Sequence, residues 1–139
     1  MSRILIVEDN RPFADALAYA FQLEGHEVAV AATADEGIRF GLAHRPDVII
    51  ADWMLRSDLH GGDVCRRIHA ACPLMKAIII TGCSDIVSQA ARCSPCVAAV
   101  IEKPFHTEEI IGAVRLALSD ASEANPWIYQ RLVPASALG

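Results

Sequence analysis

Residues 4–10 read ILIVEDN, a run of four branched aliphatic residues that ends in two acids and an amide. The short apolar run predicts a buried strand over residues 3–7. The carboxylates of Glu8 and Asp9 follow it directly, and they repel each other unless a cation lies nearby. The end of this strand is therefore the first candidate for a charged site.

The alternation of apolar strand and helix recurs about five times along the chain. Continuous apolar strands separated by helices predict an α/β fold, a doubly wound parallel sheet with helices on both faces. Strands are expected at residues 3–7, 26–32, 47–52, 76–82 and 97–103, and helices at 12–25, 33–44, 63–71, 84–92 and 106–119. Thr33 is expected to cap the second helix.

Polar side chains stand at the C-terminal ends of four of these strands. They are Glu8 and Asp9, then Asp52, then Thr81 with Gly82, and finally Lys103 before Pro104. In an open parallel sheet these ends share one edge, so three acids, a hydroxyl group and one cation are expected to converge there. Oxygen ligands alone suit Mg²⁺. Without a metal, repulsion and partial burial are expected to raise the pKa of at least one carboxyl group.

Length and charge limit the classes of function. The 139 residues suit one domain, and 12 basic against 17 acidic residues give a net charge of -5, which disfavours binding to nucleic-acid phosphates. No apolar run approaches the roughly 20 residues of a membrane span. Acids as early as residue 8 do not fit a secretion signal. We expect a cytoplasmic protein without nucleic-acid or membrane partners.

The cysteines are too few and too irregularly spaced for a disulfide framework. They are Cys65, Cys72, Cys83, Cys93 and Cys96. Residues 93–96 read CSPC, but this motif closes a predicted helix, whereas a redox CxxC opens one. No second cysteine or histidine pair completes a zinc site. The favoured interpretation is that the cysteines are small buried residues.

Four motifs in this order, at strand ends, carry a family resemblance: VEDN (7–10), DVIIADWML (47–55), IIITG (78–82) and IEKPF (101–105). Together they resemble the chemotaxis-regulator-like receiver domain of bacterial two-component response regulators. The resemblance implies a flavodoxin-like (βα)5 fold with strand order 2-1-3-4-5. It also implies a receiver domain over residues 1–119 and a tail over 120–139.

By this resemblance Asp52 is the phospho-acceptor, which attacks the phosphohistidine of a sensor histidine kinase or phosphotransfer protein. The implied Mg²⁺ ligands are Glu8, Asp9, Asp52 and the backbone carbonyl of Met54. Thr81 and Lys103 would each bind a phosphoryl oxygen. The chain is then a switch that changes its contacts with a downstream protein and is not a turnover enzyme. A homodimer is left open.

The chain departs from the family pattern at two positions that bear on function. Arg56 stands where the family usually has a proline, either reaching the acidic site or, as we favour, lying in solvent as a loop cation. Val100 replaces the aromatic residue that swings inward on activation in many receivers. The resemblance therefore does not establish that a downstream partner senses activation through the fourth helix, fifth strand and fifth helix.

The last twenty residues, 120–139, are too short for a DNA-binding or catalytic domain. Within them Asn125 and Pro126 predict the start of a short helix over 126–132. We expect a lone receiver, and a receiver fragment of a larger regulator or hybrid kinase stays open.

Three other functions compete with the phosphorylation switch. A receiver-fold adaptor that works without phosphorylation is kept open by Arg56 and Val100. A haloacid-dehalogenase-type phosphatase needs a second aspartate two residues after the first, where this chain has Met54. A flavodoxin needs a phosphate-cradling loop after the first strand, which is absent.

Overall fold

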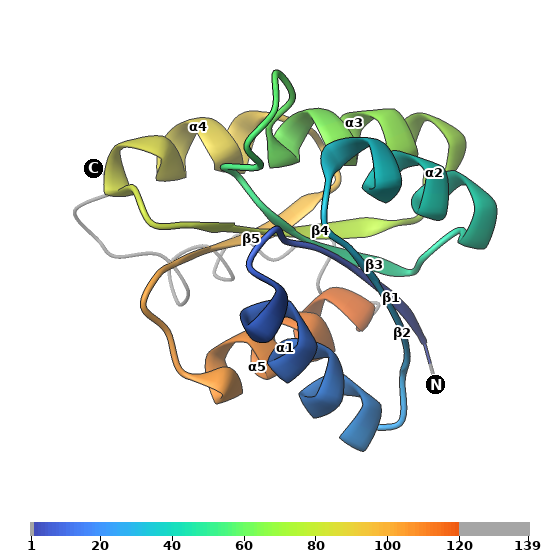
Figure 1. Ribbon diagram of the computed structural model, residues 1–139. Coiled ribbons are helices and arrows are strands. Elements are labelled where there is room, and N and C mark those ends of the chain that lie inside the picture. Colours follow the sequence, from blue (N-terminus) through green and yellow to red (C-terminus); the bar gives the residue numbers. More distant parts are fainter. Residues whose placement is uncertain (1, 120–139) are drawn as a thin grey trace.

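The computed structural model describes residues 2–119 and shows a three-layer α/β fold (Figure 1). Five parallel strands form one sheet in the order β2-β1-β3-β4-β5, which confirms the predicted order. The strands are β1 (Arg3–Val7), β2 (Glu27–Ala31), β3 (Val48–Asp52), β4 (Lys76–Thr81) and β5 (Val97–Glu102). The helices are α1 (Arg11–Leu23), α2 (Ala34–His44), α3 (Gly61–Ala71), α4 (Val87–Arg92) and α5 (Thr107–Leu118).

Helices cover both faces of the sheet. α1 and α5 pack on one face and α2, α3 and α4 on the other. Side chains of β1 alternate between the two cores, with Ile4 and Ile6 facing α1 and α5, and Leu5 and Val7 facing the opposite layer. Because both faces are covered, β1 is apolar at every position from Ile4 to Val7, as its sequence indicated.

Side-chain caps fix where α2 and α3 begin. Thr33 Oγ1 accepts a hydrogen bond from Glu36 N–H at 3.1 Å, so the predicted cap of α2 is confirmed. α3 begins at Gly61, two residues before the predicted start. His60 Nδ1 accepts from Asp63 N–H at 3.3 Å, while Asp63 Oδ2 accepts from His60 N–H at 3.1 Å. The two hydrogen bonds form a capping box, which makes Asp63 the third residue of α3 and not the first.

The segment between β4 and β5 is less regular than predicted. A 3₁₀ turn, Ser84–Ile86, precedes the six-residue α4, where one helix over 84–92 was expected.

All five cysteines are free thiols; Cys65, Cys72 and Cys96 are buried, but Cys93 is half-buried and Cys83 is exposed. The prediction of small buried residues is therefore wrong for Cys83, because it lies in the connection that follows β4.

Nothing in residues 2–119 forms a helix long and apolar enough to cross a membrane. The predicted tail, with its helix over 126–132, lies outside the described residues.

Gly61 gives a test of how tightly α3 is packed against the end of β3. A Cβ at Gly61 would lie 2.3 Å from the backbone oxygen of Asp52, whereas a Cβ at Gly112 in α5 would meet nothing within 4 Å. Gly61→Ala is expected to lower the free energy of unfolding by about 1–3 kcal/mol through overpacking. Gly112→Ala, the control, is expected to raise it by about 0.5–1 kcal/mol. Urea unfolding of both variants measures this, and equal effects of the same sign would contradict it.

Candidate functional site

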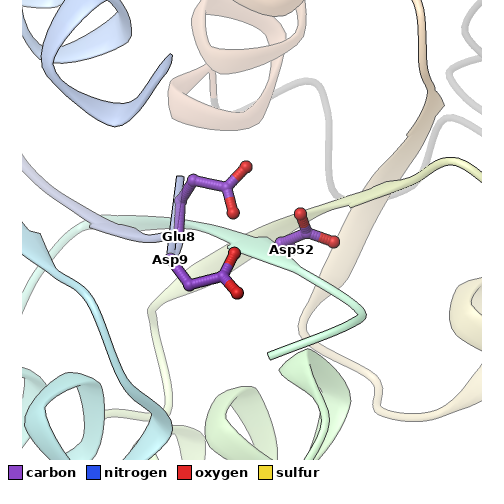
Figure 2. A group of neighbouring side chains, drawn as sticks. All are labelled: Glu8, Asp9 and Asp52. Carbon is purple, nitrogen blue, oxygen red and sulfur yellow. The ribbon is translucent and has the colours of Figure 1, made fainter. Parts of the chain in front are cut away.

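The register of the sheet brings the predicted acidic residues together. Val7 pairs with Ala51 across β1 and β3, so the residues that follow, Glu8 and Asp52, lie at the same edge. One carboxylate oxygen from each of Glu8, Asp9 and Asp52 lies within 4.8 Å of the other two (Figure 2). Glu8 and Asp52 are buried, with 2% and 6% of their surface exposed.

Lys103 joins this acidic group from the end of β5. Its Nζ lies 2.7 Å from Asp52 Oδ2 and 3.1 Å from Glu8 Oε1, so it donates to two carboxylates at once. It also lies 5.0 Å from the centre of the Phe13 ring. Burial lowers the pKa of Lys103, but the hydrogen bond and charge of Asp52, together with those of Glu8, raise it overall. Lys103 therefore stays charged.

One ammonium group does not keep both buried carboxyl groups ionised. Burial, followed by the charge of Asp52, raises the pKa of Glu8 from its ordinary 4.5 to about 7, although the hydrogen bond from Lys103 acts in the opposite direction. The expectation that at least one carboxyl pKa would be raised is confirmed. The acidic group is thus short of positive charge at neutral pH.

The donor set fits a Mg²⁺ ion. Ligand oxygens at about 2.1 Å from such an ion lie roughly 3–4.2 Å apart. The three carboxylate oxygens here lie within 4.8 Å of one another, which is compatible with this range. Met54 N–H donates to Asp52 Oδ1 at 3.1 Å, so the backbone expected to supply a carbonyl ligand runs beside the acidic group. An all-oxygen set with excess negative charge is what a hard divalent cation requires.

Thr81 lies at the end of the neighbouring strand β4 and is fully buried. Its hydroxyl group accepts from Cys83 N–H at 3.1 Å and lies 3.4 Å from Cys83 O. A Cβ added at Gly82 would meet nothing within 4 Å, so there is free space beside Thr81. Lys103 N–H donates to Thr81 O at 2.8 Å, which places the two predicted phosphoryl ligands on paired strands.

Arg56 is the residue whose position differs from the favoured expectation. Its side chain is 90% exposed, as a loop cation would be, yet its Nε lies 2.9 Å from Asp9 Oδ2. Arg56 therefore reaches the acidic site, and the interpretation as a purely solvated cation is wrong. The sequence alone did not favour this contact, because it depends on how the connection between β3 and α3 folds back toward β1.

Two other side chains near the site have clear structural roles. The Trp53 ring is stacked on His60, with ring centres 3.9 Å apart and planes 13° apart, and this contact was not predicted. Val100 is fully buried and pairs with Ile79 in the sheet. No aromatic ring is available at that position to swing between core and solvent.

Comparison with known proteins identifies related domains. Residues 4–115 match the family model of the response regulator receiver domain. The response regulator ArlR of Staphylococcus aureus is 34% identical over 120 residues, which make up 85% of this chain and 53% of that protein. The chain thus spans about half the length of the regulators that it matches.

Two solved receiver domains share the fold closely. A CheY-like response regulator receiver domain protein from Methanospirillum hungatei JF-1 has a TM-score of 0.75 and 29% identity, covering 88% of this chain and 97% of that chain. A receiver domain protein from Clostridium thermocellum has a TM-score of 0.76 and 25% identity, covering 85% and 94% of the two chains.

The raised pKa of Glu8 makes a prediction for the metal-free protein. Between the ordinary pKa of 4.5 and the folded value of about 7, the folded state binds more protons at Glu8 than the unfolded chain does. The contribution of Glu8 to the free energy of unfolding therefore falls as pH rises through that window. Urea unfolding in EDTA at about pH 5 and about pH 7.5 measures it.

Two variants separate this effect from other titrations. Glu8→Gln is expected to lose less stability than the wild type over the same interval, because the amide does not titrate. Glu108→Gln, at an exposed position in α5, is expected to keep the wild-type pH dependence. A wild-type dependence in Glu8→Gln would contradict the assignment.

Proposed function

The chain belongs to the response regulator receiver family, and on that basis we propose that it is a phosphorylation-controlled switch in which Asp52 accepts a phosphoryl group. The observation that carries the proposal is the contact of Lys103 with Asp52 and Glu8 at the edge where β1, β3 and β5 end. A buried, cation-paired carboxylate next to two further acids suits nucleophilic attack on phosphorus better than it suits stability. The proposed receiver unit is residues 1–119.

The proposed chemistry transfers one phosphoryl group. An Asp52 carboxylate oxygen attacks the phosphorus of a phosphohistidine, the phosphorus–nitrogen bond breaks, and an acyl phosphate forms on Asp52. The donor protein is a sensor histidine kinase or a phosphotransfer protein. The imidazole leaves with the electron pair of the broken bond. The product stays on the chain, so the protein changes state and does not turn over a free substrate.

Glu8, Asp9, Asp52 and the backbone carbonyl of Met54 are the proposed ligands of Mg²⁺. The ion, when bound, offsets the charge of the attacking carboxylate and the phosphoryl oxygens. Glu8 with a pKa of about 7 exchanges its proton readily near neutral pH, so it is available as a ligand directly or through water. Excess acidic charge at this edge supports the assignment.

Lys103 and Thr81 are proposed to bind the phosphoryl oxygens. Lys103 Nζ lies 2.7 Å from Asp52 Oδ2, within reach of a group attached to that oxygen. The Thr81 hydroxyl group is held by the backbone of Cys83 and has to exchange this partner to reach the phosphoryl group. That exchange would shift the start of the segment leading to α4, through which a downstream protein senses the change.

Phosphorylation is tested by intact mass after incubation with acetyl phosphate or phosphoramidate and Mg²⁺. We expect one added phosphoryl group on the wild type and none on Asp52→Asn or in EDTA. Asp58→Asn, at an exposed position of the same loop, is the matched control and should label like the wild type. Absence of labelling by either donor, with no Mg²⁺ binding in a titration, would favour the phosphorylation-independent adaptor.

The proposed role of Thr81 is tested by hydrogen exchange of residues 84–92 with and without the phosphoryl donor. The wild type and Thr81→Ser, which keeps the hydroxyl group, should show a change in exchange on labelling. Thr81→Val should label at Asp52 but lose most of this change, because it has no hydroxyl group to exchange. The same change in all three proteins would show that the Thr81 hydroxyl is not the link.

A further inference from the structure

We propose that Arg56 is a cation supplied by the chain itself to Asp9, which a divalent metal ion has to displace in order to bind fully. The inference rests on the proposed function, because Asp9 is one of the three carboxylates assigned to Mg²⁺. It adds a residue that sets the affinity of the site without being one of its ligands.

The loop between β3 and α3 holds Arg56 at a defined place beside Asp9. Arg56 Nε lies 2.9 Å from Asp9 Oδ2, and Asp9 is largely shielded, with 23% of its side chain exposed. The arginine backbone has φ of 31°, a left-handed conformation that residues with a Cβ seldom adopt. The loop therefore holds Arg56 in this place against its local backbone preference.

Two cations divide the acidic group between them. Lys103 lies against Glu8 and Asp52, the two buried carboxylates, and Arg56 lies against Asp9 at the outer side. In this arrangement each of the three carboxylates has a positively charged partner. A metal ion placed among them would share Asp9 with the guanidinium, and the two positive charges would repel each other.

The exposure of Arg56 determines the size of the effect. With 90% of its side chain in solvent, the arginine leaves Asp9 at little cost, since exposed ion pairs are weak. Arg56 thus lowers the affinity for Mg²⁺ but does not block the site. Screening by salt should reduce its influence, because the charge acts mainly through solvent.

Calorimetric titration of the full chain with Mg²⁺ tests the proposal. Arg56→Gln is expected to bind Mg²⁺ about two- to fivefold more tightly than the wild type, the range that the loss of an exposed ion pair allows. The gain should shrink when NaCl is added. Arg56→Lys keeps the charge and is expected to bind with nearly wild-type affinity.

The matched control is Arg115→Gln, which removes an exposed arginine that also pairs with a carboxylate, Glu24. Glu24 caps the C-terminal end of α1, whereas the acidic site lies before its N-terminal end. This variant should bind Mg²⁺ like the wild type, so it separates the local contact from the general effect of one lost positive charge.

Three results would overturn the inference. Equal affinities of Arg56→Gln and Arg115→Gln would show that the contact with Asp9 does not matter, while the proposed function would stand. Equal tightening by Arg56→Gln and Arg56→Lys would assign the effect to loop shape and not to charge. Absence of Mg²⁺ binding in all four proteins, with normal urea unfolding, would remove the metal site and this inference with it.

Discussion

The contact of one lysine with two buried carboxyl groups is the constraint on which the site depends. Lys103 lies against Asp52 and Glu8, yet the pKa of Glu8 is still raised to about 7. Burying ionised groups costs free energy that a single partner does not recover. A core selected for stability alone would place apolar side chains here. On the proposed function, the excess of three carboxylates over two cations at this edge serves a metal ion and a phosphoryl group that bind there.

Parallel pairing explains why residues far apart in the chain reach this contact. Val7 pairs with Ala51, Asp52 with Ile80 and Thr81 with Glu102, so the ends of these neighbouring strands are offset by one residue at most. If β3 shifted by one residue relative to its neighbouring strands, its side chains, including that of Asp52, would turn to the opposite face of the sheet. The length of each apolar run limits that shift, because moving β3 along its neighbours would carry Asp47 or Asp52 toward the apolar core. Core packing and site geometry are therefore set by the same pairing.

Sequence patterns predicted what depends on strand ends and missed what depends on loops. The α/β class and the meeting of Glu8, Asp9, Asp52 and Lys103 follow from periodicity and the common edge of parallel strands, whereas the sheet order came from the family resemblance. The early start of α3, the stack of Trp53 on His60 and the contact of Arg56 with Asp9 all lie in or beside the connection between β3 and α3. There the backbone path is decided by tertiary contacts, which periodicity does not report.

The contrast between strands and loops also applies to how phosphorylation would change the surface that a partner contacts. Val100 is fully buried in β5 and too small to change exposure as a ring does. Thr81, by contrast, is hydrogen-bonded to Cys83, and Cys83 immediately precedes the 3₁₀ turn Ser84–Ile86 and the short α4. A short helix has few backbone hydrogen bonds and moves at low cost. On the proposed function, transmission therefore runs along the chain from Thr81 into α4 and not across β5.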